Sequence, residues 1–330
     1  MTMPQHIERH EPTSELLAGD SPGRVARRLL LATRPGFFPA SVAPVIVGSA
    51  WGYSVAGGLD WVLFGLALVA TLLVHLASNV LNDVGDDLSG ADRINEDRIF
   101  PYTGGSRFIQ NGILTARQMA GLGVALLVLG LFVGLALAAL RGPTVLIFGV
   151  IGVALGVLYS VPRIELSAHG VGEAAIAVAF GLLPVNGAAW LQSGRLDWES
   201  ILISVPVSMW VAAILLINEV PDRGPDGRAG KRTLVVRLGV NNTRRLYLLL
   251  HLTAATALLA AGVMGLIPWW MGAISVALLP GAYRAAVHIR EPLDRTRLLN
   301  SIELTLRLHT AGCALILVAI LLSVFLGSKA

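Results

Sequence analysis

The chain of 330 residues is poor in charge and nearly free of cysteine. Only 14% of its residues are charged, whereas 55% are hydrophobic, and the mean hydropathy is +0.70. Soluble globular domains carry about 25% charged residues, so this composition argues against a soluble protein. The single cysteine, Cys313, has no partner within the chain, which excludes an intramolecular disulfide and a cysteine-based zinc site.

The sequence instead contains many long apolar runs. Many approach or exceed the ~20 residues that a helix needs to cross a bilayer. They lack the period-two alternation of membrane-spanning strands, which argues against a β-barrel. The sequence therefore predicts an all-α polytopic membrane protein, with nine transmembrane helices around a central cavity. We expect these helices at residues 38–57, 61–82, 116–139, 143–161, 170–192, 199–218, 244–263, 266–285 and 302–326.

The first 36 residues mix acids, bases, proline and glycine before any long apolar run. A signal peptide would instead lead from a short charged region directly into an apolar core. We expect residues 1–36 to form a cytosolic tail and residues 37–330 to form a single transmembrane domain. Within the tail, the segment from Arg24 to Thr33 suits a short basic amphipathic helix on the membrane surface. For residues 1–20, disorder is an equally good interpretation.

Positive charge is distributed unevenly between the two predicted sides of the membrane. With a cytosolic N-terminus, nine helices place all of the 25 Lys and Arg residues except Arg141, Arg195 and Lys329 on the cytosolic side. Cytosolic loops carry such an excess, so the bias supports the helix count and this orientation. We expect a multi-pass integral membrane protein, of the cell (inner) membrane if the source is bacterial or archaeal, with its active site at the cytosolic side. The pI of about 9.6 then reflects contact with anionic lipid and phosphate, with no need for nucleic acid.

A polar stripe interrupts the second apolar run at its predicted cytosolic end. Asn79, Asn82, Asp83 and Asp86 stand at i, i+3, i+4 and i+7, with Asp87 beside them, so a helix places them on one face. Carboxylates within a membrane are costly and usually functional. Carboxylates on one stripe repel one another unless a cation offsets their charge. Mg²⁺ suits the site, because it takes one or two carboxylates and completes its shell with water and substrate phosphates.

A second cluster lies at the end of the sixth apolar run. Asn218, Asp222 and Asp226 are spaced by four, and Lys231 and Arg232 follow closely. Two acidic clusters that face one another can clamp a diphosphate through two metal ions.

The separation of the two clusters suggests a weak internal duplication. They are four helices apart, which relates helices 1 to 4 to helices 5 to 8, with motif loops 83–115 and 219–243 facing one cavity. Pro221 and Pro225 predict that the stretch carrying the second cluster is not one continuous helix.

Together, "SNVLNDVGDDLSGADRINEDR" and "INEVPDRGPDGRAGKRTLVVRLG" resemble the UbiA superfamily of intramembrane prenyltransferases. In that superfamily an Asn-Asp-x-x-Asp-x-x-x-Asp motif and an Asp-x-x-x-Asp motif bind a prenyl diphosphate through Mg²⁺. The first motif maps onto Asn82, Asp83 and Asp86, but its last aspartate falls on Gly90. Either Asp87 or Asp92 could replace it. A second register, Asn79, Asp83 and Asp87, fits a looser spacing, and the second motif maps onto Asp222 and Asp226.

Three further stretches, "PYTGGSRFIQNGILT", "LYSVPRIELSAHGVGE" and "NEVPDRGPDGRAGKRTLVVRLG", are similar to the branch that prenylates 1,4-dihydroxy-2-naphthoate in menaquinone synthesis. Relatives with similar clusters prenylate homogentisate, 4-hydroxybenzoate, haem, chlorophyllide or lipid head groups, and these acceptors remain open. The resemblance implies Mg²⁺-dependent transfer from a polyprenyl diphosphate to a small aromatic acceptor, without an obligate protein partner.

The resemblance also implies roles for individual residues. Metal binding falls to the carboxylates Asp83, Asp86, Asp87, Asp222 and Asp226, all of which except Asp87 we place with Lys231 in the catalytic set. Arg98 and Arg232 would add contacts to the diphosphate, and Asn79, Asn82 and Asn218 would contact substrate. Tyr102 and Tyr159 could face the allylic cation that forms when the C–O bond breaks.

A cation-coupled transporter is an alternative from a different class, because such proteins also combine repeated helices with buried acids. The basic residues beside both clusters favour an anionic diphosphate over a translocated cation. Glu173 could contact substrate or simply favour the start of a helix. Gly104 and Gly105 are expected to shape a loop over the cavity.

Overall fold

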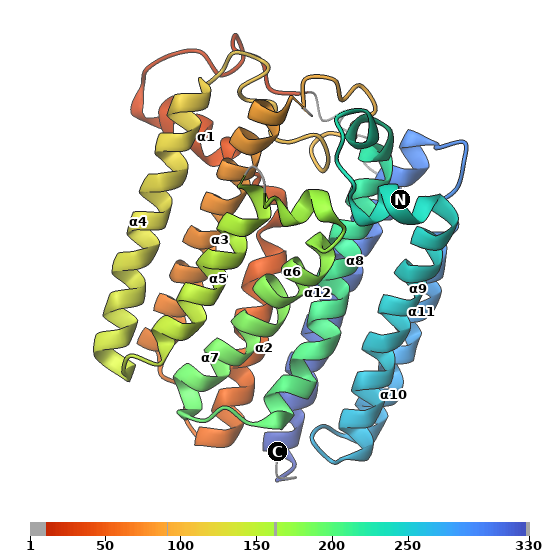
Figure 1. The fold of residues 1–330 in the computed structure, drawn as a ribbon. Helices are drawn as coiled ribbons and strands as arrows, with labels where there is room; N and C mark the ends of the chain where they lie inside the picture. Colours follow the sequence, from red (N-terminus) through yellow and green to blue (C-terminus); the bar gives the residue numbers. More distant parts are fainter. Residues whose placement is uncertain (1–10, 91, 162–163, 328–330) are drawn as a thin grey trace, which may run out of the picture.

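The computed structural model describes residues 11–90, 92–161 and 164–327, and every regular element within these ranges is helical. The long helices run side by side in one bundle (Figure 1). In chain order the elements are α1 (Pro22–Ala32), η1 (Pro35–Phe37), α2 (Pro39–Ala56), α3 (Trp61–Ser89), α4 (Ala116–Arg141), α5 (Val145–Ser160), η2 (Leu166–His169), α6 (Gly172–Ile176), η3 (Ala177–Leu182), α7 (Leu183–Ser193), α8 (Trp198–Arg228), α9 (Leu234–Val263), α10 (Trp269–Ile274), η4 (Ser275–Leu278), α11 (Leu279–Ala286) and α12 (Arg295–Phe325).

The bundle has the length and apolar character of a multi-pass membrane protein. Among the described residues, six helical segments could cross a bilayer, or seven if the pair Pro22–Ala32 and Pro35–Ala56, bent by 56°, counts as one span. The all-α class and the multi-pass character are therefore confirmed. Each of the nine predicted runs lies mainly in helix, but several are short or broken. Nine complete spans and a cytosolic N-terminus stay predictions.

Close packing between helices depends on small residues. A Cβ atom on Gly48 of α2 would lie 2.0 Å from the carbonyl oxygen of Val185, and one on Gly52 would lie 2.6 Å from that of Ala189, in α7. Glycine therefore allows the backbones of α2 and α7 to touch, as is common between membrane helices. By contrast, α4 leaves large apolar side chains such as Leu131 and Phe132 exposed, which suits contact with lipid tails.

Helix α3 extends beyond the predicted end at residue 82 and carries the whole first polar stripe as far as Ser89. Asp60 caps its N-terminus by accepting hydrogen bonds from the backbone N–H groups of Val62 and Leu63. Gly90, with φ of +79°, ends the helix in the left-handed conformation. The glycine that interrupts the motif is therefore the residue that turns the chain into the loop over the cavity.

The predicted break at Pro221 and Pro225 is wrong, because α8 continues through both prolines to Arg228. Each proline removes one backbone hydrogen bond of the helix. Their spacing by four places both defects on one face, and both prolines are buried. Packing of α8 against its neighbours holds the helix together, so its acidic residues keep a fixed helical spacing.

The predicted tail contacts the rest of the protein from residue 11 onward. Residues 24–32 are helical within α1, as predicted. Glu11 pairs with Arg98, Asn111 donates to the carbonyl of Pro12, and Leu17 is buried. Residues 11–20 are thus packed on the loop between α3 and α4, contrary to the interpretation of disorder. Residues 1–10 lie outside the described part of the chain.

Candidate active site

A cavity of about 1000 Å³ lies between α2, α3, α4, α5, α6–α7 and α8. Its polar side chains come from the ends of α3 and α8 and from the loop between α3 and α4, which lie at the top of Figure 1, opposite the C-terminus. The rest of the lining is largely apolar. The cavity therefore combines a polar head with a long hydrocarbon-like body.

On the α3 side, the side chains of Asn79, Asn82 and Asp86 line the cavity. Asn82 donates from Nδ2 to Asp86 Oδ2 at 2.9 Å and accepts at Oδ1 from the Ser160 hydroxyl at 3.1 Å. Asn79 donates to the Thr33 carbonyl at 3.0 Å. These contacts orient one oxygen-rich face of the helix toward the cavity.

On the α8 side, Asn218, Asp222 and Asp226 line the same cavity. Asp222 accepts hydrogen bonds from Asn95 Nδ2 at 2.8 Å and from the backbone N–H of Gly104 at 3.4 Å. The structure thus brings together the clusters that sequence placed 139 residues apart, counted from Asn79 to Asn218.

The loop over the cavity needs glycine at two successive positions. Gly104 and Gly105 have φ of +70° and +74°, a region that other residues rarely occupy. A Cβ atom on Gly105 would lie 2.7 Å from Asp92 Oδ2 and 3.1 Å from Asp83 Oδ1. The loop backbone can therefore approach the carboxylates only where side chains are absent. This accords with the loop-shaping role expected for both glycines.

Lys231 joins the two halves of the polar head. Its side chain is 10% exposed, pairs with the carboxylate of Asp86, and lies 3.2 Å from Glu165 Oε1. Burial alone would lower the pKa of this ammonium, but the carboxylates of Asp86, Asp226 and Glu165 raise that pKa above its ordinary value. Lys231 is therefore a permanent positive charge at the edge of the cavity.

Asp83 and Asp92 hold carboxylate oxygens that lack a hydrogen-bond partner. Asp83 accepts from the backbone N–H of Ser106 at 2.9 Å through one oxygen, while its Oδ1 is buried without a partner. Asp92 lines the cavity, is 4% exposed, and has an unpartnered Oδ2. Burial, together with the carboxylates of Asp86 and Asp83, raises the pKa of Asp92 to about 8. Such oxygens are suited to a cation.

Asp87, by contrast, does not line the cavity. Its carboxylate accepts from Arg93 at 3.2 Å and from Gln110 at 3.3 Å. Of the two candidates for the missing motif aspartate, the structure therefore places Asp92, not Asp87, at the cavity wall.

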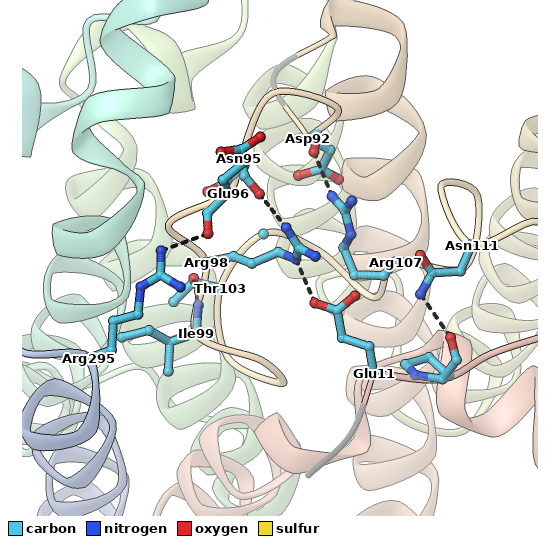
Figure 2. Close-up of polar contacts among 12 residues, drawn as sticks. Glu11, Asp92, Asn95, Glu96, Arg98, Ile99, Thr103, Arg107, Asn111 and Arg295 are labelled. Atoms are coloured by element: carbon cyan, nitrogen blue, oxygen red, sulfur yellow. Dashed lines mark hydrogen bonds and ion pairs between the residues drawn. The ribbon is translucent and has the colours of Figure 1, made fainter. Parts of the chain in front are cut away.

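Two predicted diphosphate contacts also lie outside the cavity lining. Arg98 donates to Glu11 Oε1 and to the Asn95 carbonyl, both at 2.6 Å (Figure 2). Arg107 donates to the carbonyl of Asp92 at 2.5 Å (Figure 2). The side chain of Arg232 is exposed, and only its backbone contacts Ala168 and Arg237. Arg98 and Arg107 thus hold the loop in place from behind.

Aromatic residues and one unpredicted arginine complete the wall. Tyr102 and Tyr159 both line the cavity, and Tyr102 packs edge-on against Phe37 with ring centroids 5.8 Å apart. Arg34 also lines it, donates to the Tyr102 carbonyl at 2.6 Å, and has a buried Nε without a partner. Neither Arg34 nor Asn95 was predicted. Neither residue belongs to a helical stripe of polar residues in the sequence. Each reaches the cavity only because of the way its segment folds back onto the bundle.

The site fits a hard cation that is only partly coordinated by protein. The described residues contain no group of three or more His, Cys, Asp or Glu side chains close enough to hold an ion by themselves. The donor set is nevertheless all oxygen, with free carboxylate oxygens on Asp83 and Asp92. Mg²⁺ commonly takes one or two carboxylates and fills its other positions with water and phosphate. Candidate holders are Asp86 and Asp92 on one side, and Asp222 and Asp226 on the other. The predicted ligand Asp83 does not line the cavity, but its unpartnered Oδ1 keeps it a candidate behind Asp92.

The apolar body of the cavity reaches the outer surface of the bundle. Val128 and Leu131 of α4 and Val150 of α5 line the cavity, yet they are 44%, 57% and 67% exposed. The cavity therefore opens sideways, where α4 and α5 meet the apolar exterior.

Comparisons with known proteins agree with this architecture. The model of the UbiA prenyltransferase family matches residues 41–306. A 1,4-dihydroxy-2-naphthoate octaprenyltransferase from Escherichia coli is 30% identical over 307 residues, covering 91% of this chain and 96% of the relative. Its counterpart from Mycobacterium tuberculosis is 32% identical over 258 residues, covering 78% and 84%.

A solved structure shares the fold. A UbiA homologue from Archaeoglobus fulgidus, bound to DMAPP and Mg²⁺, superposes with a TM-score of 0.63 at 17% identity, covering 87% of this chain and 99% of the other. The two chains therefore share this helical fold. The chain belongs to the UbiA prenyltransferase family. The family resemblance seen in the sequence is confirmed, and these matches do not support the transporter alternative.

Proposed function

We propose that this prenyltransferase moves a polyprenyl group from a polyprenyl diphosphate to 1,4-dihydroxy-2-naphthoate, in an Mg²⁺-dependent step of menaquinone biosynthesis. One observation carries the proposal: carboxylates from α3, α8 and the intervening loop meet Lys231 at the head of an apolar cavity. The head suits a metal-bound diphosphate and the body suits a prenyl chain. The naphthoate acceptor is supported by relatives of that name at about 30% identity over most of the chain.

The chain's own residues provide for departure of the diphosphate. When bound, Mg²⁺ would neutralise diphosphate charge and make it a better leaving group. Lys231 can donate charge-assisted hydrogen bonds to diphosphate oxygens, after exchanging part of its contact with Asp86. Asn95 and the Gly104 N–H hold Asp222 in place for its role at the metal. Arg34 adds a second positive charge at the cavity wall.

The cavity also suits the carbon chemistry. Heterolysis of the C–O bond releases diphosphate and leaves an allylic cation. The acceptor ring attacks the terminal carbon of that cation and then loses a proton, or its carboxylate as CO₂, to restore aromaticity. The ring faces of Tyr159 and Tyr102 can stabilise that cation. The apolar body excludes water, which would otherwise capture the cation. The sideways opening lets the long prenyl tail remain among lipid chains while its diphosphate occupies the head.

We place the active site at the cytosolic side of the cell membrane. The support is the excess of Lys and Arg in the loops at that end of the bundle. The water-soluble naphthoate would reach the polar head from the cytosol, whereas the polyprenyl diphosphate would enter from the bilayer through the sideways opening, with its anionic diphosphate at the cytosolic face.

The test uses the purified full-length protein in detergent or nanodiscs. It would receive Mg²⁺, a labelled polyprenyl diphosphate, and separately 1,4-dihydroxy-2-naphthoate, homogentisate or 4-hydroxybenzoate, with product mass analysis. We expect prenylated naphthoate, and loss of product in EDTA and in the D222N variant. Product from another acceptor alone would refute the naphthoate assignment. Full activity in EDTA would refute the metal-dependent mechanism.

A further inference from the structure

Glu219 is a buried carboxylate of the cavity wall that the mechanism above leaves without a role. It belongs to α8, is 8% exposed, lines the cavity, and has an Oε2 atom without a hydrogen-bond partner. Thr233, which also lines the cavity, supplies a hydrogen bond to its side chain. A buried carboxylate with a free oxygen is costly unless something satisfies it.

A second carboxyl group lies beside it. Glu173, in the first turn of α6, is 5% exposed, and its carboxyl lies beside that of Glu219, which is its side-chain neighbour for hydrogen bonding. Glu173 does not line the cavity. It therefore lies on the protein side of Glu219, where it can position the Glu219 carboxyl.

Glu219 lies deeper in the cavity than Asp222, a candidate holder of the metal. It precedes Asp222 by three residues, which corresponds to about 4.5 Å along a helix, away from the polar head. Tyr159 is close enough to interact with the charge of Glu219, and Leu215, one helical turn earlier on α8, lines the same cavity. This depth is where a flat ring would lie between the leaving group and the prenyl body.

The charge and hydrogen-bonding pattern identifies what can occupy this position. Of the side chains lining the cavity, Arg34 and Lys231 are its cations, and Lys231 already contacts Asp86 and Glu165. A ligand of Glu219 must therefore bring its own hydrogen-bond donor. The prenyl diphosphate brings none, because it is an anion joined to a hydrocarbon. A hydroxylated aromatic acceptor brings phenolic O–H groups.

We propose that Glu219 binds a ring hydroxyl of the aromatic acceptor, and that Glu173 is the positioning residue that holds Glu219 for this contact. The proposal rests on the proposed function and deepens it, since it assigns the acceptor subsite. Glu219 selects acceptors that donate a hydrogen bond at that position. It is separate from the carboxylates that face the diphosphate.

The primary test measures equilibrium binding in EDTA, so that neither metal nor turnover contributes. Wild-type protein would be titrated with 1,4-dihydroxy-2-naphthoate and with 1,4-dimethoxy-2-naphthoate, which keeps the ring and the carboxylate but lacks the O–H donors. We expect the wild type to prefer the dihydroxy compound. E219Q keeps an amide oxygen that can accept the hydrogen bond but removes the charge, so it should bind the dihydroxy compound about 10-fold more weakly and show a reduced preference. E173Q should show a smaller loss.

Two controls separate this role from others. E199Q, at the opposite end of α8, should bind both compounds like the wild type. In turnover assays, E219Q should raise the KM for the acceptor while leaving the KM for the prenyl diphosphate and the Mg²⁺ concentration for half activation within about threefold. E219D, which keeps the charge but withdraws it by one methylene, provides a second variant if E219Q does not elute as a folded species.

An unchanged preference for the dihydroxy compound in both E219Q and E219D would overturn the proposal. A tenfold or larger shift in the Mg²⁺ requirement of E219Q would also overturn it, because Glu219 would then be a metal ligand. If the wild type prenylates a different hydroxylated ring, the naphthoate assignment fails and the same comparison is made with that ring and its methyl ether. If the wild type uses no hydroxylated aromatic, both proposals fail.

Discussion

The choice between Asp92 and Asp87 gives the sharpest prediction about the site. Asp92 presents an unpartnered buried oxygen beside the cavity, whereas Asp87 is held by Arg93 and Gln110 outside it. D92N keeps the shape of the side chain and removes its charge. A contact of about 1.5–3 kcal/mol to a charged group would then be lost. Since 1.4 kcal/mol corresponds to a factor of ten, we expect about a 10- to 150-fold loss in kcat/KM.

D87N should behave differently, because it weakens a contact to an arginine whose side chain is 69% exposed. Exposed ion pairs contribute little, so activity should fall by less than about threefold. The assay is prenyl transfer at saturating acceptor over a range of Mg²⁺ concentrations, and only D92N should require more Mg²⁺. D97N serves as a matched control in the same loop, since Asp97 is half exposed and pairs with Arg295. A larger loss in D87N than in D92N would refute the assignment.

Four further predictions concern charge, stability, packing and topology. K231M should raise the KM for the prenyl diphosphate by about 10-fold or more, and K231R should recover part of the loss; an unchanged KM would remove Lys231 from the diphosphate site. In EDTA, the free energy of unfolding should fall as pH rises from about 4 to 8, because folded Asp92, with a pKa near 8, binds more protons there than the unfolded chain does. Thermal denaturation would measure this slope, which D92N should reduce. G48L, whose first side-chain atom would meet the Val185 carbonyl at 2.0 Å, should cost at least about 1–3 kcal/mol and lower the Tm, whereas G65A, with open space around it, should not. In a C313A background, a membrane-impermeant maleimide should label E96C only from the cytosolic face and R195C only from the other; the reverse would overturn the orientation.

Helix periodicity made much of the site predictable. Asn79, Asn82 and Asp86 share one face in any helix, and the structure turns that face toward the cavity together with Asn218, Asp222 and Asp226. The sequence was misleading at the two prolines of α8. Local propensity predicts a break at Pro221 and Pro225, but burial of α8 among its neighbours outweighs the lost backbone hydrogen bonds.

Other features depend on contacts between distant parts of the chain. Arg98 has the charge of a diphosphate ligand, yet Glu11 and the Asn95 carbonyl hold it behind the loop (Figure 2). Asn95 reaches Asp222 across 127 residues of sequence, and no spacing rule relates the two. From the sequence, Glu173 could simply be an acidic residue that favours the N-terminus of a helix. Only its position beside Glu219 in the structure indicates a further role.

The sequence by itself determined the membrane setting, the helical class and the two acidic clusters, because hydropathy and helical periodicity are local properties of the chain. The family followed from the resemblance of the two cluster motifs. Only the tertiary structure decided which carboxylates share the cavity. It placed Asp92 at the wall and Asp87 outside, and it set Glu219 one turn below Asp222 with Glu173 beside it. The reason is physical: whether a carboxylate is available to a ligand depends on the partners that folding brings to it, and those partners come from other helices and from the loop beyond Gly90.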